Sequence, residues 1–168
     1  CTIGIDTWAV DYVLLDDEGE LLGQPVAYRD ARTQGVMEQV FQQIPKETIY
    51  KKTGIQFLNF NTLYQLFVED DNLLDKTDKI LMIPDYIAYK LTGKMTGEVT
   101  NWSTTQFLHL ESRTYDKDLL EVLDIDTSKF PDLIEAGEII GALKVTGYDL
   151  PEAQVIAVGT HDTASAVV

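Results

Sequence analysis

The sequence predicts a mixed α/β domain. Short apolar runs typical of strands come first, apolar residues at helical spacing fill the middle, and a buried strand followed by a helix comes last. With 168 residues, of which 45% are apolar and 24% charged, the chain has the composition of a globular protein. This length corresponds to one domain, or one and a half, and is enough to bury a core.

The chain begins with strands. Ile3–Ile5 is a short apolar strand, Asp11–Asp16 is a second, and Leu21–Tyr28 is a third. A short acidic turn, Asp17-Glu18-Gly19-Glu20, separates the second strand from the third. The order strand, tight turn, strand predicts a β-hairpin.

Helices follow in the middle of the chain. Apolar spacing and start signals predict them over Gly35–Ile44, Pro45–Thr53, Phe60–Glu69, Pro84–Leu91 and Tyr115–Leu123. Gly54 and Gly93 end two of these helices, because glycine is favoured just past a helix C-terminus. Asn61 or Thr62 is the predicted N-cap of the third.

The remaining segments are assigned from composition. Asn101–Gln106 is rich in hydroxyl groups and predicts a polar loop, and Phe130–Lys144 predicts irregular structure with two glycines. Ile80–Ile83 is an apolar stretch. Val155–Val158 predicts a buried strand, and Asp162–Val168 the first turns of a helix.

Charge and cysteine usage exclude several classes of function. The chain has 13 Lys and Arg against 28 Asp and Glu, a net charge of −15, which argues against nucleic-acid partners and anionic membrane surfaces. The one cysteine, Cys1, excludes an internal disulfide and a thiolate zinc site. His109 and His161 are too few for a histidine-rich metal site, so no metal site is predicted.

The ends of the sequence read as cut. Cys1–Asp6 resembles a strand already under way, and Asp162–Val168 resembles a helix that stops early. We therefore expect a fragment of a longer chain. The sequence has no apolar run of transmembrane length and no visible secretory signal, so the expected compartment is the cytoplasm.

The strongest candidate for chemistry is the segment from Val155 to Ala166. A buried strand runs through a glycine turn, Gly159-Thr160-His161, into a helix of small residues that opens at Asp162. Open α/β sheets bind ligands outside the carboxyl ends of their strands. An aspartate at that point can act as a general base, or it can simply cap the helix, and the spacing leaves both interpretations open.

Two further segments suit a hydroxyl-rich ligand. Trp8 follows the first strand and offers an apolar ring face together with an N–H donor, although it could equally pack a hairpin. Asn61 lies in a stretch, 56–65, where aromatic residues alternate with amides, which both donate and accept. The alternative for that stretch is a helix entrance lined by core aromatics.

The order of these segments resembles the N-terminal domain of the FGGY carbohydrate kinases, from end to end of residues 1–168. The stretches that carry the resemblance are Ile3–Asp11, Pro25–Thr33, Gly54–Phe57, Asn61–Leu66, Pro84–Tyr86, Leu91–Met95, Thr100–Asn101, Thr104–Gln106 and His161–Val167. Each is a weak signal alone, but the combination is specific.

The resemblance implies a ribonuclease H-like fold of the actin/sugar-kinase superfamily, truncated at its start. It also implies a complete enzyme of two such domains, which transfers the γ-phosphoryl group of Mg·ATP to the 1-hydroxyl of L-rhamnulose, in L-rhamnose breakdown. By this resemblance the Asp-x-Gly phosphate loop and the C-terminal domain, which bind ATP and Mg²⁺, lie outside residues 1–168. The fragment is therefore expected to be inactive alone and to contain no cofactor-binding or metal-binding residue.

The resemblance also assigns roles to single residues. Asp162 is the expected general base, His161 and Thr163 are expected to flank the sugar, and Ala9 occupies a sugar-contact position. Trp8, Asn61 and Asp162 itself complete the expected substrate-binding set. Glycerol kinases place an Arg-Glu pair where this chain has Ala9-Val10, which counts against glycerol and leaves room for an apolar 6-methyl group.

Three alternatives stay open. The substrate could be another ketose, such as L-fuculose or D-xylulose, because these sugars differ by one methyl group or one hydroxyl orientation. The domain could be a sugar-binding module without catalysis. It could also be an interaction domain in which Asp162 is only a helix cap.

Overall fold

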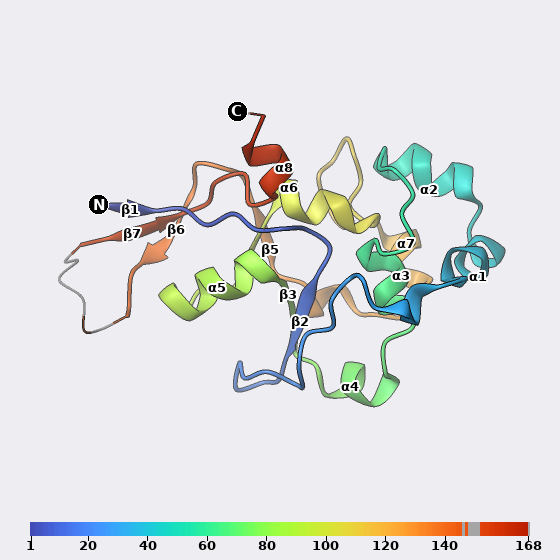
Figure 1. The fold of residues 1–168 in the computed structure, drawn as a ribbon, viewed down its shortest axis with the longest axis horizontal. Helices are drawn as coiled ribbons and strands as arrows, with labels where there is room; N and C mark the ends of the chain where they lie inside the picture. Colours follow the sequence, from blue (N-terminus) through green and yellow to red (C-terminus); the bar gives the residue numbers. More distant parts are fainter. Residues whose placement is uncertain (146, 148–151, 168) are drawn as a thin grey trace.

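The computed structural model describes residues 1–145, 147 and 152–167, and it confirms a mixed α/β fold (Figure 1). A three-stranded sheet has the order β1-β7-β6, formed by Thr2–Ile3, Gln154–Ile156 and Ile139–Ala142. β1 and β7 are parallel, whereas β6 is antiparallel to β7. Segments from opposite ends of the sequence therefore lie side by side and run in the same direction.

The predicted hairpin is wrong. β2 (Tyr12–Leu15) pairs with β3 (Lys79–Met82) in antiparallel register, so its partner is distant in sequence. The predicted strand Leu21–Tyr28 is reduced to one bridge, between Leu15 and Leu21. The acidic turn does form, but the chain beyond it contains Pro25, which lacks the N–H that a ladder needs. The apolar stretch that forms β3 instead buries β2.

The segment Phe130–Lys144 is not irregular as predicted. It contains β5 (Asp132–Ile134), which pairs in parallel with β4 (Thr96–Glu98), and it also contains β6. Both strands are short, and β6 pairs with β7 through a register shift between Ile139 and Gly141. A shift of this kind interrupts the alternation of apolar and polar residues that identifies a strand.

The predicted helices are present, several of them shorter than expected. They are α1 (Val36–Gln43), α2 (Lys46–Thr53), α3 (Thr62–Phe67), α5 (Ile83–Thr92) and α7 (Lys117–Glu121). Gly54 and Gly93 end α2 and α5 in the left-handed conformation, as predicted. The sequence did not predict α4 (Asp71–Lys76), which has no buried residue and hence no apolar periodicity. The segments η1 (Ala31–Thr33) and η3 (Thr127–Lys129) are short 3-10 helices.

The predicted polar loop Asn101–Gln106 is also wrong. This segment forms the end of α6 (Val99–Trp102) and all of η2 (Ser103–Thr105). Its hydroxyl groups bond to carbonyl groups three residues earlier, as in the 2.7 Å bond from Thr104 Oγ1 to the Asn101 carbonyl. The hydroxyls are thus satisfied inside the helical turns rather than by solvent.

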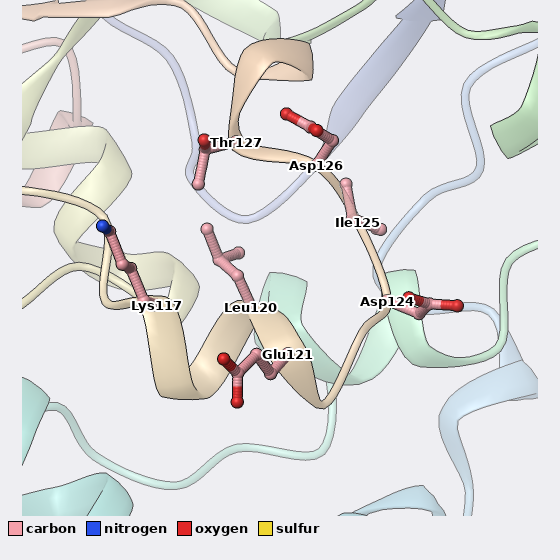
Figure 2. A pocket seen from close by; sticks show the side chains of 7 residues that line it. All are labelled: Lys117, Leu120, Glu121, Asp124, Ile125, Asp126 and Thr127. Atoms are coloured by element: carbon pink, nitrogen blue, oxygen red, sulfur yellow. The ribbon is translucent and has the colours of Figure 1, made fainter.

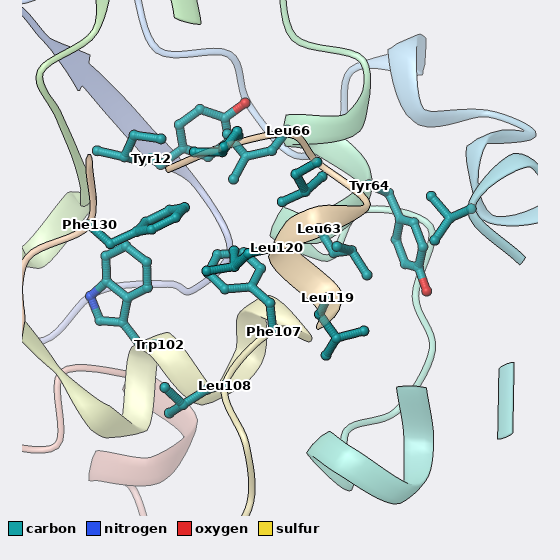
Figure 3. Close-up of a cluster of buried hydrophobic side chains, with 14 of the residues drawn as sticks. Tyr12, Leu63, Tyr64, Leu66, Trp102, Phe107, Leu108, Leu119, Leu120 and Phe130 are labelled. Carbon is teal, nitrogen blue, oxygen red and sulfur yellow. The ribbon is translucent and has the colours of Figure 1, made fainter. Parts of the chain in front are cut away.

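The main core combines aliphatic side chains with a group of aromatic rings around Trp102 of α6 (Figure 3). Trp102 is fully buried and packs edge-on against Phe130, with ring centroids 5.7 Å apart, while Phe107 and Phe130 are 5.3 Å apart. Leu63 on α3 and Leu120 on α7 belong to the same cluster. This packing fixes α6 against the helices that surround it.

A glycine allows Trp102 to lie against β4. A Cβ atom on Gly97 would come within 2.7 Å of Trp102 Cδ1, which is closer than side-chain atoms pack. The indole Nε1–H of Trp102 then donates to Asp85 Oδ2 at 2.7 Å.

In the described part of the chain, no helix is both long enough and apolar enough to span a membrane.

Candidate active site

A cavity of about 400 Å³ brings together most of the predicted site residues. Trp8, Ala9, Asn61, His161 and Asp162 all line it. These residues come from three separate parts of the sequence, so the fold assembles them as the resemblance implied. The rest of the lining consists of Val10, Tyr28, Ile55, Gln56, Leu58, Phe60 and Thr104.

A second hollow, of about 410 Å³, lies on α7 and the chain that follows it (Figure 2). Figure 2 shows its lining, with Lys117, Leu120 and Glu121 on the helix and Asp124 to Thr127 beyond it. It contains none of the predicted site residues. We therefore place the candidate site in the first cavity, which we call the Asp162 cavity.

The Asp162 cavity lies beyond the carboxyl ends of β1 and β7. The chain after β1 and the chain after β7 continue side by side, because Thr7 N–H donates to the Thr160 carbonyl at 3.0 Å. Asp162 N–H returns a bond of 2.9 Å to the Thr7 carbonyl. The location agrees with the prediction that a ligand site forms at the carboxyl ends of parallel strands.

Asp162 is the first residue of α8 (Asp162–Ser165), and it is not the N-cap. His161 holds the cap position, and its side chain makes no capping bond. The predicted helix thus begins where expected, while its last predicted residue, Val168, lies outside the described residues. The structure therefore does not support the interpretation of Asp162 as a simple helix cap.

The Asp162 carboxylate is solvent-accessible, and one of its oxygens is hydrogen-bonded to Thr163. Its side chain is 55% exposed, and Oδ1 accepts the backbone N–H of Thr163 at 2.6 Å and the Thr163 hydroxyl at 3.3 Å. His161 Nε2 lies 3.6 Å from the same oxygen. Thr163 is not among the residues that line the cavity, and its contacts orient Asp162. A sugar contact by Thr163 stays a prediction.

Trp8 forms part of the cavity lining and is held by a residue that the sequence did not single out for this purpose. Its indole Nε1–H donates to Asp11 Oδ2 at 2.8 Å. Asp11 is only 5% exposed, and this burial raises the pKa of its carboxyl group above the ordinary value. The bond orients the indole while leaving Trp8 47% exposed at the cavity.

An unusual backbone conformation places Ala9 in the cavity. The next residue, Val10, has φ of +69°, which is rare for a β-branched residue. Its carbonyl accepts the Thr62 hydroxyl at 2.8 Å and the Gln65 side-chain N–H at 3.1 Å. Two donors from α3 thus hold the strained peptide whose neighbour lines the site.

Asn61 lines the cavity with both ends of its amide already bonded inside the protein. Its Oδ1 accepts Leu58 N–H at 2.7 Å, and its Nδ2 donates to the Thr104 carbonyl at 2.9 Å. Asn61 occupies the predicted cap position of α3, but its side chain does not cap that helix. These bonds tie together two segments of the lining, and a direct sugar contact by Asn61 stays a prediction.

The rest of the lining is largely apolar and was not predicted residue by residue. Ile55 and Leu58 contribute aliphatic surface, and the rings of Tyr28 and Phe60 pack with centroids 5.0 Å apart. The alternation of aromatics and amides over residues 56–65 was the available signal for Phe60. Tyr28 lies in the stretch Pro25–Thr33 that carries the family resemblance, but its contact with Phe60 arises only in the folded chain.

The described residues do not by themselves form a metal centre. Within 1–145, 147 and 152–167, no group of three or more His, Cys, Asp or Glu side chains is placed to hold a metal ion. The described residues place one accessible carboxylate in the cavity, that of Asp162.

Comparison with known proteins identifies the family. Residues 1–168 match the model of the N-terminal domain of the FGGY family of carbohydrate kinases. The chain is 55% identical to a rhamnulokinase of Ligilactobacillus salivarius over 99% of its own length and 35% of the relative's length. It is 52% identical to a rhamnulokinase of Bacillus subtilis, over 100% of the chain and 35% of the relative.

Solved structures show the same fold at lower identity. A ligand-bound xylulose kinase from Lactobacillus acidophilus has a TM-score of 0.83 at 23% identity, over 92% of this chain and 33% of that protein. The glycerol kinase of Plasmodium falciparum, solved with ADP, has a TM-score of 0.78 at 20% identity, over 94% and 33% of the two chains. The chain thus spans about a third of the length of the proteins it matches, and it belongs to the FGGY family of carbohydrate kinases, of which it represents the N-terminal domain.

Proposed function

We propose that this chain is the sugar-binding part of a longer kinase that phosphorylates L-rhamnulose at its 1-hydroxyl. The observation that carries the proposal is the Asp162 cavity, in which an accessible carboxylate lies against a largely apolar lining. The two rhamnulokinases at 55% and 52% identity support the choice of substrate. Since the chain spans 35% of each, the activity is assigned to the full-length protein, meaning the longer protein that carries this sequence.

In the proposed reaction Asp162 acts as the general base. The bond between the γ-phosphorus of ATP and its bridging oxygen breaks, a bond to the sugar oxygen forms, and the proton of the 1-hydroxyl passes to the Asp162 carboxylate. The Thr163 N–H, 2.6 Å from Oδ1, limits the rotation of that carboxylate. Most of the acceleration in such a reaction comes from positioning and charge stabilisation rather than from the base alone.

ATP and Mg²⁺ are proposed to bind mainly through elements outside this chain. The described residues offer no cluster of metal-ligating side chains. We propose that the C-terminal domain of the full-length protein supplies the nucleotide site and closes the cleft over the sugar. Because the reaction consumes ATP, the proposed compartment is the cytoplasm.

The lining of the cavity supports a deoxy sugar. The side chain of Ala9 is a single methyl group, and Ile55 and Leu58 add aliphatic surface. An apolar 6-methyl group gains from such contacts, whereas a hydroxyl placed there without a partner would lose its hydrogen bonds to water. L-fuculose shares the methyl group and D-xylulose lacks it, so these two ketoses are the informative alternatives.

The test is an assay of ADP release by the full-length protein with ATP, Mg²⁺ and each of L-rhamnulose, L-fuculose, D-xylulose and glycerol. We expect the highest kcat/KM with L-rhamnulose. A higher value with another ketose would reassign the substrate and keep the kinase class. A protein that binds L-rhamnulose by calorimetry but releases no ADP with any sugar would instead be a sugar-binding module.

A further inference from the structure

Glu98, the last residue of β4, is buried, charged and absent from the lining of the Asp162 cavity. We propose that Glu98 is a positioning residue, which fixes the turn that presents Asp162 to the substrate. This inference rests on the proposed function, because it concerns the orientation of the proposed base. Glu98 does not touch the sugar, and its effect passes through the main chain of Thr160 and His161.

The Glu98 carboxylate is the point where two segments meet. Oε2 accepts the backbone N–H of Thr160 at 2.9 Å and the Thr160 hydroxyl at 3.0 Å. Oε1 accepts the Thr100 N–H at 3.0 Å, and Oε2 also accepts the Thr100 hydroxyl. Four donors from residues 60 positions apart in sequence therefore converge on one side chain, and two of them belong to the turn before Asp162.

Further bonds extend this link to the residue next to Asp162. The Thr100 hydroxyl oxygen accepts His161 N–H at 3.4 Å, and Asn101 Nδ2 donates to the Thr160 carbonyl at 3.3 Å. On the opposite side, Thr7 bonds to both Thr160 and Asp162. The turn is thus held between the start of α6 and the chain after β1, and Figure 1 shows α8 beside α6.

The position of Asp162 in the first turn of α8 makes this support important. The first backbone N–H groups of a helix have no partner within the helix, so contacts from outside it help to fix its first residue. The direction of the Asp162 side chain follows from the main chain at His161 and Asp162. A shift of about 1 Å in a reacting group can lower the rate by about 100-fold.

Burying the Glu98 side chain costs free energy unless hydrogen-bond donors satisfy its carboxylate. The residue is 1% exposed, and none of the ion pairs formed by the described residues includes it. A buried carboxylate without a cation is tolerated only when donors satisfy it, as the two threonines do here. An amide could not replace it fully, because its NH₂ group would face an N–H or O–H donor in either orientation.

A neighbouring acid, Asp85, is bonded to the main chain of Glu98. Asp85 Oδ1 accepts Glu98 N–H at 3.3 Å, and burial raises the pKa of Asp85 to about 8. Asp85 therefore holds its proton more readily than an exposed aspartate does.

Glu98 also caps α6, so the test must separate positioning from stability. The variants are Glu98→Gln and Thr160→Val in the full-length protein, the second of which removes one donor and leaves Glu98 in place. Asp116→Asn is the matched control, because Asp116 is another buried carboxylate that caps a helix, accepting Leu119 N–H at 3.2 Å. Asp116 contacts neither the turn nor the cavity.

We expect Glu98→Gln to lower kcat for L-rhamnulose by about 10- to 100-fold while KM changes by less than about threefold. Thr160→Val should lower kcat by a smaller factor in the same way. Asp116→Asn should lower the melting temperature and leave kcat unchanged. A Glu98→Gln protein with the kcat of the control would overturn the proposal.

A second measurement does not depend on activity. Hydrogen exchange of the peptide that spans residues 159–165 should be faster in Glu98→Gln than in the parent protein, and unchanged in Asp116→Asn. If the parent protein phosphorylates no sugar, the proposed function fails, yet this exchange still reports whether Glu98 fixes the turn. Equal exchange rates in all three proteins would contradict the positioning role.

Discussion

The indole Nε1–H of Trp8 donates to Oδ2 of Asp11 at 2.8 Å, and this bond joins the surface of the Asp162 cavity to the interior of the domain. The other carboxylate oxygen, Oδ1, is buried and has no partner within the described residues. Asp11 therefore carries a cost of burial that the bond to Trp8 offsets only in part. The indole that lines the cavity is thus oriented by a buried group that is absent from the lining.

Asp11→Ala should weaken sugar binding without a large effect on the chemical step. The indole loses its acceptor and gains rotational freedom, which must be lost again when the sugar binds. We expect KM for L-rhamnulose to rise by about 3- to 10-fold, corresponding to a bond worth about 1 kcal/mol, with kcat nearly unchanged. Trp8→Phe should act similarly, and the double variant should show less than the sum of both effects. Full additivity would show that the two residues act separately.

Ala9 should limit the size of the group that fits beside it. Ala9→Leu adds three carbon atoms to a cavity of about 400 Å³ at the proposed sugar position, and KM should rise by about 10-fold or more. Ala9→Gly is the control and should change KM by less than about threefold. Steady-state kinetics with L-rhamnulose measure KM for both variants. If Ala9→Leu had the KM of the parent, the sugar would have to bind elsewhere.

Asp85 should make the stability of the fold depend on pH. Its pKa is raised by burial from 3.8 to about 8 in the folded state, so between about pH 4 and pH 8 only the folded state keeps the proton. The free energy of unfolding should therefore fall as pH rises through this range, by up to about 1.4 kcal/mol per pH unit.

The variant Asp85→Asn isolates this contribution. Asparagine cannot ionise, although it loses one of the bonds that Asp85 accepts from Trp102 and Glu98. We expect the variant to be less stable than the parent at pH 5, with a difference that shrinks towards pH 8. Urea unfolding of the full-length proteins at several pH values measures this, and a difference that stays constant would contradict it.

Gly97→Ala should destabilise the aromatic core. The added Cβ would lie within 2.7 Å of Trp102 Cδ1 and would force the indole away from Asp85. Overpacking of this kind costs about 1–3 kcal/mol, so a clear drop in melting temperature is expected. Trp102→Phe should lower the stability of the Gly97→Ala variant less than it lowers that of the parent protein, because the smaller ring leaves room for the methyl group. Two costs that simply add would show that the contact with Gly97 is unimportant.

The sequence predicted the helices better than the sheets. α1, α2 and α5 follow from apolar spacing and from glycines at their ends, which are local signals. The pairing of β2 with β3 is not local, because the paired residues Leu15 and Lys79 are 64 positions apart in the sequence. Short strands such as β5 also carry too few residues for a periodic pattern.

The sequence predicted several residues that line the Asp162 cavity, but not their supporting contacts. Motif order and residue type pointed to Asp162, His161, Trp8 and Ala9, which line the cavity and whose roles stay predictions. The role of Glu98 could not be read from the sequence, because its four donors become neighbours only when the chain after β7 packs against α6. Supporting residues of this kind depend on tertiary contacts rather than on local pattern.

The most direct test of the account compares binding and turnover in Asp162→Asn. The full-length variant keeps the size of the side chain and one oxygen acceptor for Thr163 N–H, but it cannot accept a proton as a carboxylate does. We predict that L-rhamnulose binds to the variant within about threefold of the parent affinity by calorimetry, while kcat falls by at least about 100-fold. A variant that phosphorylates the sugar at the parent rate would contradict the assignment of Asp162 as the base and, with it, the proposed mechanism.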